Sequence, residues 1–315
     1  SLIVFSGRVD LAEDALSNAC ERALGAWKKQ MPAHPVAWIR RTAQRVLIDE
    51  LRREQALARR RHLVVAEESI EAAEKAPSMI DDRVEMLWLA CHPALGSESR
   101  PILALRFVLG LSTERIARMF LVSTSTMAAR ITRAKKRATL AGFALTSSRD
   151  YPERSDDVAR ALSVAYTAAY FANDKATGDL VSLVQQTAWN YPQPALSALD
   201  VLVSLTHARR AARIDTSGRL LTLAEQDRSL WRSDETTAAL RRYTALAPSA
   251  GYAEELRAYA TIEAAHSLAP DIERTNWGLI EAAHDRLAQL GDSPLDRLEE
   301  AAGRAAAGRS VAIAE

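Results

Sequence analysis

A basic stretch in the N-terminal half of the chain has the composition of a surface that binds a polyanion. From Arg115 to Arg149 the sequence contains eight Lys and Arg residues and no Asp or Glu. Solvated helices normally mix acids with bases, because ion pairing and solubility favour both signs. An ordinary basic surface helix is the alternative interpretation. The lack of any acid favours binding to nucleic acid phosphates.

A second basic stretch, Lys28 to Arg61, contains ten bases and three acids and includes Trp38. An aromatic side chain among cations can receive an unstacked base, as in proteins that bind single strands. Trp38 also lies on the apolar stripe of its expected helix, where it would belong to the core. The local sequence supports both interpretations equally.

The spacing in residues 111–139 predicts two short helices joined by a tight turn. Ser112 can cap the first helix, the chain breaks at Leu121 and Val122, and Ser123 can cap the second helix. This layout is a helix-turn-helix, whose second helix enters the major groove of DNA. The inner face of the second helix is expected to consist of Met127, Ile131, Ala134 and Ala138.

The outward face of this second helix is small, polar and basic, which lets the helix approach bases. Arg130 is the best candidate for a bidentate contact with guanine, a contact worth about 1–3 kcal/mol of base discrimination. The other outward candidates are Thr124, Ser125 and Arg133, and those placed for phosphates are Ser123, Thr126, Lys135, Lys136 and Arg137.

Composition predicts an all-α protein of more than one domain. Hydrophobic residues make up 48% of the 315 residues, and 12 Gly and 11 Pro are few for this length, a mix that favours helix. Residues 1–149 contain 24 bases and 16 acids, a net charge of about +8, whereas residues 150–315 contain 17 bases and 24 acids, about −7. A polyanion would therefore be attracted to one half and repelled by the other.

Several function classes have no support in the sequence. No apolar run has the length of a membrane span, and the N-terminus lacks the layout of a secretory signal, so we expect a cytoplasmic protein. Cys20 and Cys91 give no disulfide framework, and Cys91 with His92 lacks further ligands at zinc-like spacing. We expect no catalytic site, no metal and no cofactor.

The N-terminal residues resemble region two of the extracytoplasmic-function sigma factors of bacterial RNA polymerase. Residues 10–27 resemble the helix that docks on the clamp coiled coil of the polymerase β′ subunit. Residues 34–54 resemble the helix that melts and reads the minus-ten element. The resemblance implies polymerase binding by Asp10, Glu13, Asp14, Glu21 and Trp27, and minus-ten binding and melting by Trp38, Arg41, Arg45, Arg52 and Arg53.

Residues 80–137 are similar to region four, which binds the minus-35 element and the polymerase β flap. The stretches 91–95 and 120–137 point to the subgroup with a C-terminal tetratricopeptide-like extension, which residues 207–231 and 276–287 also resemble. The matching extension positions include Tyr166, Tyr170, Arg209, Arg210, Arg213, Asp227 and Trp231.

Two departures from the family are visible. Region two of the family usually begins with another helix, but only nine residues precede Asp10, so we expect a truncated start. The stretch YTAAY at 166–170 replaces a phenylalanine-asparagine-glutamate-glycine-tyrosine stretch of the family.

The expected domains are a region-two domain over 1–62, an acidic linker over 63–80, a region-four helix-turn-helix domain over 81–146 and a helical extension over 150–315. The linker would thread the basic channel of the polymerase, or would only solubilise the chain. In the extension we expect roughly seven helices, with one of the breaks at Thr216–Gly218.

The resemblance implies a sigma factor that binds core RNA polymerase, recognises the minus-35 and minus-ten elements and promotes strand opening, without covalent chemistry. The extension would bind a regulatory protein or another part of the chain. One alternative is a helix-turn-helix transcription regulator whose extension serves as effector or dimerisation domain. Another is a helical scaffold whose basic faces are incidental.

Overall fold

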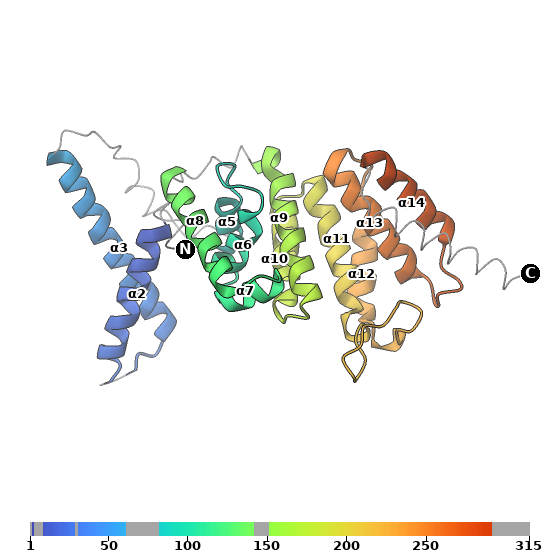
Figure 1. Ribbon diagram of the computed structural model, residues 1–315, viewed down its shortest axis with the longest axis horizontal. Coiled ribbons are helices and arrows are strands. Elements are labelled where there is room, and N and C mark those ends of the chain that lie inside the picture. The colour runs from blue at the N-terminus through green and yellow to red at the C-terminus, as the bar shows by residue number, and fades with distance from the viewer. Residues whose placement is uncertain (1, 3–8, 29–30, 61–81, 142–150, 292–315) are drawn as a thin grey trace, which may run out of the picture. The chain divides into compact units, whose positions relative to one another are not determined.

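The computed structural model describes residue 2 and residues 9–28, 31–60, 82–141 and 151–291, and these residues divide at 150/151 into two compact units (Figure 1). The described residues form helices, turns and one isolated β-bridge, between Ile214 and Leu220. The all-α prediction is confirmed. In the part of the chain that the structure describes, no helix is both long enough and apolar enough to cross a membrane.

The N-terminal unit begins with two long helices, α2 (Val9–Ala26) and α3 (Pro35–Arg60), which pack against each other (Figure 1). Pro35 begins α3, where the missing amide hydrogen has no intrahelical partner to lose. The small alanines on the inner face of α2 allow α3 to approach closely, with Leu47 of α3 fully buried. The buried residues of α2 are Ala12, Ala15, Ala19 and Ala23.

The second part of this unit is a set of short helices: α5 (Asp82–Ala90), α6 (Ser99–Leu103), α7 (Thr113–Met119) and α8 (Thr124–Ala141). A π-helical turn, η2 (Ala104–Val108), continues α6, and Gly110 ends it with a φ of 67°. Such a φ favours glycine because it has no Cβ. The apolar core here combines Leu89, Leu95 and Leu103 with Ala134 and Ala138 of α8.

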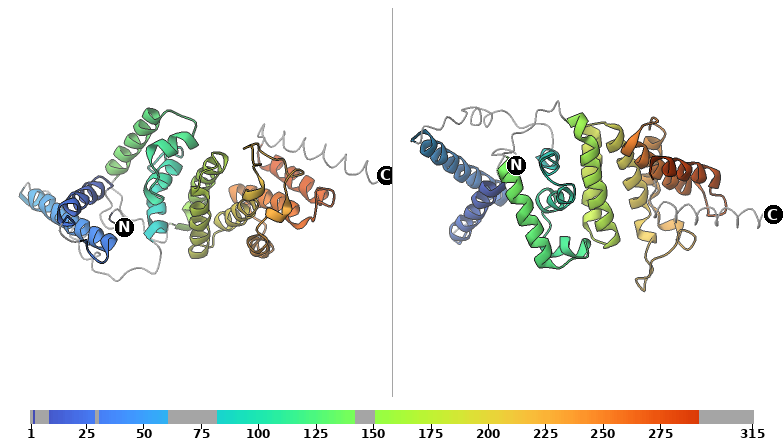
Figure 2. Two further views of the ribbon diagram at one scale, coloured as in Figure 1. Left: turned by 90° about the horizontal axis from the view of Figure 1, so that it is seen from below. Right: turned by 45° about the horizontal axis from the view of Figure 1, so that its top comes forward.

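The C-terminal unit is a succession of helices that lie side by side, as the two views of Figure 2 show for α9 to α13. Their bounds are α9 (Tyr151–Phe171), α10 (Ala176–Asn190), α11 (Pro194–Ala208), α12 (Ser233–Tyr243), α13 (Gly251–Leu268) and α14 (Trp277–Leu290). Helix α11 packs against α9, α10, α12 and α13, and α13 packs against α14.

The sequence of α11 explains its central place. Its apolar residues are distributed around the whole helix, and Leu196, Leu199 and Val201 are fully buried. A helix that is apolar on all sides is stable only when other helices surround it. The polar residues that it does carry, Asp200 and Ser204, are also buried.

Residues 209–232 differ from the sequence-based expectation of helix on both sides of Thr216–Gly218. The structure has two 3₁₀ turns here, η4 (Arg210–Ala212) and η5 (Arg228–Leu230), and irregular backbone between them. Tertiary contacts outweigh the helix propensity of this Arg- and Ala-rich stretch. Arg213 donates to the carbonyl of Tyr170 at 2.6 Å, in the last turn of α9.

Candidate nucleic-acid interface

Helices α7 and α8 form a helix-turn-helix whose two caps agree with the sequence-based expectation. The hydroxyl of Ser112 accepts a hydrogen bond from the amide of Arg115 at 3.3 Å, and that of Ser123 accepts from the amide of Thr126 at 3.2 Å. Between the helices, Leu121 has a φ of 53°. Backbone in this left-handed region ends α7 and turns the chain into α8.

Four apolar residues hold α8 in place and set which face looks outward. Met127, Ile131, Ala134 and Ala138 are all buried, as the spacing predicts. The opposite face therefore points away from the core. The exposed residues of that face include Thr124, Ser125, Ala128, Arg133, Lys136 and Arg137.

The candidate DNA-binding residues on α8 differ in how available they are. The hydroxyl of Ser123 lies 3.0 Å from that of Ser125 and 2.8 Å from that of Thr126, so these groups already bind one another. Arg130 is half-buried. Lys135 is half-buried too, and its ammonium forms an ion pair with Glu13 of α2.

The charge on this helix-turn-helix is one-sided. Within residues 113–138, all of which the structure describes, Glu114 is the one acidic residue, and it lies in the first turn of α7. Hydrogen bonds from its own backbone amide and from Ser112 lower the pKa of Glu114. A carboxylate at this position stabilises the N-terminus of α7. On α8 itself, the exposed Arg133, Lys136 and Arg137 have no acidic neighbour along the helix.

The candidate melting residues lie along α3. Arg41, Arg45, Arg52 and Arg53 are exposed, and Arg53 is 3.3 Å from Glu50. Trp38 is half-buried, with its ring edge-on to that of Trp27 at 5.7 Å between centroids. One part of Trp38 thus packs in the core while another part faces water, so the structure keeps both interpretations of this residue.

Four of the candidate polymerase-binding residues lie on α2 outside its buried alanines, and the fifth, Trp27, follows α2 directly. Asp14 and Glu21 are exposed, and Asp10, Glu13 and Trp27 are half-buried. The sequence argument missed a second stripe on α2, with Leu16 44% and Leu24 72% exposed and Cys20 between them. Its four-residue spacing was visible in the sequence, in parallel with the stripe that the buried alanines form.

In the C-terminal unit, the arginines that resemble the family's extension bind the ends of helices. Arg210 donates to the carbonyl of Asp174 at 2.9 Å, just after α9, and Arg228 donates to that of Ala269 at 2.6 Å, just after α13. Positive charge at a helix C-terminus is favourable because the last carbonyls are unpaired. These side chains stabilise the fold.

The aromatic residues of the same set pack around these arginines. The rings of Tyr166 and Tyr170 stack at 5.6 Å, and the Arg213 guanidinium lies 4.0 Å from the Tyr170 centroid. Burial raises the pKa of both tyrosines. Trp231 lies 4.4 Å from the Arg228 guanidinium. The carboxylate of Asp227 accepts from the amide of Ser229 at 2.9 Å and begins η5.

Comparison with known families identifies the helix-turn-helix. Residues 85–137, from α5 into α8, match the family described as sigma-70, region 4. The chain contains a sigma-70 region 4 domain. The chain is therefore a sigma-factor-like protein, and this family points to a non-catalytic role in transcription. Residues 154–247 match a family of unknown function (DUF6596).

A relative covers nearly the whole chain. An uncharacterized protein of Rhizobium meliloti (strain 1021) is 32% identical over 325 residues, which span 96% of this chain and 75% of the relative. The chain belongs to the same protein family as this rhizobial relative. No solved structure matches the chain significantly.

Proposed function

We propose that the chain is a sigma factor of the extracytoplasmic-function type, which gives core RNA polymerase its promoter recognition and its strand opening. The observation that carries this proposal is the capped helix-turn-helix of the region 4 domain. Its helix α8 presents exposed Lys and Arg side chains and carries no acidic residue. In this proposal the domain binds the minus-35 element and the polymerase β flap.

Within the region 4 domain, the N-terminal part of α8 enters the major groove. Arg130 reads a base, because its planar guanidinium matches the two acceptors of guanine. The remaining candidate residues position the helix on the backbone by charge and hydrogen bonding. These are Ser123, Thr124, Ser125, Thr126, Arg133, Lys135, Lys136 and Arg137.

Helices α2 and α3 form the part that binds polymerase and opens the minus-ten element. Asp10, Glu13, Asp14, Glu21 and Trp27 are proposed to contact the β′ clamp. Exposed arginines along α3 attract the phosphates of a DNA single strand, and the open side of Trp38 can stack on an unpaired nucleobase. The residues proposed for this contact are Trp38, Arg41, Arg45, Arg52 and Arg53.

The acidic linker over 63–80 lies outside the described residues. Its proposed role is to thread the basic channel of the polymerase. The extension, residues 150–315, is proposed to bind a protein rather than DNA, since its net charge of about −7 opposes phosphate contact. Comparison of residues 1–149 with the full chain in promoter-specific transcription tests its regulatory role. Equal activity of both in vitro and in cells would remove that role.

The test of the sigma function is assembly with purified core polymerase. The full chain is expected to co-elute with core enzyme and to permit transcription from a promoter that core alone does not use. A second candidate function is a helix-turn-helix regulator, because the sigma-family match covers only the DNA-binding helix-turn-helix domain, residues 85–137. Specific, salt-dependent binding to a free duplex without any core association would support the regulator and exclude the sigma factor.

A further inference from the structure

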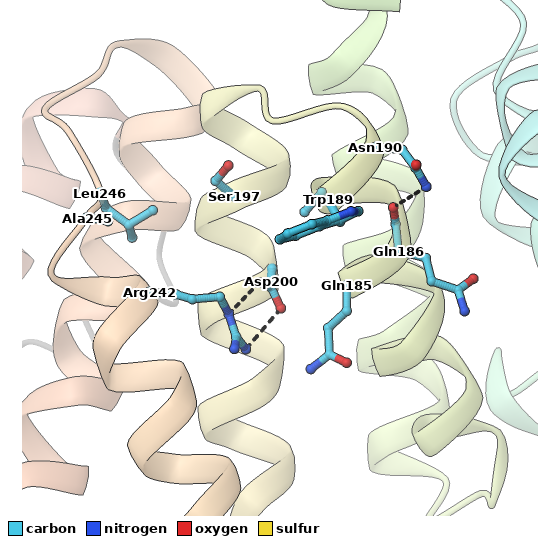
Figure 3. A pocket seen from close by; sticks show the side chains of 10 residues that line it. Gln185, Gln186, Trp189, Asn190, Ser197, Asp200, Arg242, Ala245 and Leu246 are labelled. Carbon is cyan, nitrogen blue, oxygen red and sulfur yellow. Dashed lines mark hydrogen bonds and ion pairs between the residues drawn. The ribbon is translucent and has the colours of Figure 1, made fainter. Parts of the chain in front are cut away.

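A groove crosses three successive helices of the C-terminal unit, and we call it the α10–α12 groove (Figure 3). Its volume is about 620 Å³. Helix α10 forms one wall, α11 the floor, and α12 with the loop after it the opposite wall. The lining residues are Gln185, Gln186, Ala188, Trp189, Asn190, Ser197, Asp200, Arg242, Ala245 and Leu246.

The floor of the groove is a hydrogen-bonded network without net charge. Asp200 of α11 is buried, and its carboxylate lies 2.7 Å from the Arg242 guanidinium, which Figure 3 shows reaching across from α12. Ser204 donates to Asp200 at 3.1 Å, and Gln185 donates to Ser204 at 3.2 Å. Burial raises the pKa of Asp200, and the guanidinium opposes that rise. Because the two charges compensate, the floor selects neither an anion nor a cation.

Trp189 is the most conspicuous apolar group of this groove. It is 87% exposed, although its indole lies over the groove in Figure 3. Across from it, Ala245 and Leu246 offer further apolar surface. A large aromatic ring with few rotatable bonds loses little conformational entropy on binding, so it makes an efficient anchor for a partner.

The shape of the groove decides between kinds of occupant. Gln185, Trp189, Asn190 and Ala245 are all exposed, so the groove is open along one side. Small-molecule sites usually bury roughly 70–90% of the ligand surface, and an open groove does not bury a small ligand to this extent. Nucleic acid is disfavoured by the net charge of about −7 of residues 150–315.

An extended peptide satisfies the remaining features. Gln185 and Asn190 of α10 carry exposed side-chain amides. Gln185 already donates to Ser204 at 3.2 Å and Asn190 to the carbonyl of Gln186 at 2.8 Å, so it is their amide oxygens that can accept from the N–H groups of a peptide backbone. Successive side chains of an extended peptide point to opposite sides. Every second side chain can therefore face Trp189 while the backbone meets the amides.

We propose that the α10–α12 groove binds an extended, uncharged peptide segment of a partner protein and packs one apolar side chain of that segment against Trp189. This inference rests on the proposed protein-binding role of the extension and names the site and the chemistry of the partner. Arg242 acts as a positioning residue, since it holds the floor together without facing a charged ligand.

The experiment uses the full chain and a displayed library of random twelve-residue peptides. Selected sequences are synthesised with a fluorescent label and titrated by anisotropy against the parent chain, Trp189→Ala and Leu268→Ala. Leu268 is a matched control because it is 63% exposed and does not line the groove. We expect uncharged peptides with a shared apolar residue, binding roughly 10- to 100-fold weaker to Trp189→Ala and within about twofold of the parent for Leu268→Ala.

Each other outcome overturns the inference in a recognisable way. Absence of enriched peptides, enrichment of charged peptides only, or equal binding by Trp189→Ala would show that the groove has a different use. Sedimentation of the parent and of Trp189→Ala adds one more arm, because a dimer lost with Trp189 would identify a second copy as the occupant. A thermal melt should be unchanged in Trp189→Ala. Failure of the chain to bind core polymerase, with peptide binding intact, would overturn the proposed sigma function alone.

Discussion

Lys135 of the region 4 recognition helix pairs with Glu13 of α2, so a proposed DNA-binding residue and a proposed polymerase-binding residue neutralise each other. The side chains are 30% and 36% exposed, respectively, and such a pair adds at most about 1 kcal/mol to stability. The pair also bears on binding, because each partner must leave the other before it can contact a ligand.

Glu13→Gln is expected to strengthen binding of the full chain to nonspecific duplex DNA, because Lys135 becomes available to a phosphate. One additional phosphate contact should steepen the slope of log affinity against log salt by about 0.9. Filter binding at several salt concentrations measures this slope. Glu21→Gln is the matched control, since it removes the same charge from the exposed surface of α2. Equal slopes for both variants would show that the ion pair does not limit DNA binding.

Arg130 and Lys136 should give different defects in promoter binding. Arg130→Ala is expected to relax preference at one position of the upstream element, by about 1–3 kcal/mol. Lys136→Ala should weaken all sequences alike and reduce the salt slope. Transcription by the reconstituted polymerase from every single-base variant of the element provides the measurement. If Arg130→Ala keeps the parent's ranking of these variants, Arg130 does not read a base.

Trp38→Ala tests whether the half-buried indole stacks on a base. Loss of one stack, worth about 1–3 kcal/mol, should impair promoter opening more than closed-complex formation. Permanganate reactivity of the opened strand measures this step. Trp27→Ala removes the same edge-on ring contact, and because Trp27 is itself a proposed polymerase-binding residue, opening by both variants is compared per polymerase-bound molecule. A large fall in melting temperature, with unchanged opening per folded molecule, would assign Trp38 to the core alone.

Leu121→Gly is expected to stabilise the N-terminal unit. Leu121 has a φ of 53°, a left-handed conformation that costs a non-glycine residue about 1–2 kcal/mol. Glycine removes that strain but loses more chain entropy on folding, so the net gain should be about 0.5–1 kcal/mol. Leu121→Ala is the matched control: it keeps the backbone strain and removes a side chain that is 92% exposed. Calorimetry should show Leu121→Gly melting above both the parent and Leu121→Ala; identical melting of the two variants would contradict the strain.

Glu254 gives the C-terminal unit a stability that depends on pH. Its carboxylate accepts from Arg257 at 2.6 Å and from Arg286 at 3.1 Å, and its side chain is 3% exposed. The pKa of Glu254 is lowered from 4.5 to about 2, and the hydrogen bonds from Arg257 are the largest cause. A carboxyl with a lowered folded pKa stabilises above its unfolded pKa, and this contribution is lost as pH falls from about 4.5 through about 2.

Glu254→Gln should therefore lower the free energy of unfolding by roughly 3 kcal/mol at pH 6, since one pKa unit corresponds to about 1.4 kcal/mol. The difference from the parent should shrink as the pH approaches 2. Urea unfolding of both proteins at a series of pH values tests this. Glu235→Gln, which breaks an exposed pair with Arg232 at 2.8 Å, should change stability by less than about 1 kcal/mol. A pH-independent difference between Glu254→Gln and the parent would exclude the linkage.

Local features of the region 4 domain were predictable from the sequence because they depend on near neighbours. The caps at Ser112 and Ser123 and the buried stripe from Met127 to Ala138 follow from spacing alone. The pair between Lys135 and Glu13 was not predictable, because 122 residues separate its partners.

The C-terminal unit shows the same limit. The α10–α12 groove collects residues between Gln185 and Leu246 that no periodicity connects. The helix that was expected to run on to the break at Thr216–Gly218 ends at Ala208, and Arg213 beyond it binds the end of α9, an interaction that local propensity does not contain.

The family match over residues 154–247 ends between α12 and α13, but the apolar core continues beyond it. Ala260 and Ala264 of α13 pack with Val201 and Leu205 of the central helix. A fragment that stopped at residue 247 would leave this side of α11 in water, and exposed apolar surface of this kind promotes aggregation. The family-matched segment is thus shorter than the packed helical unit to which it belongs, and deletions that aim to remove the extension cleanly should divide the chain at 150/151.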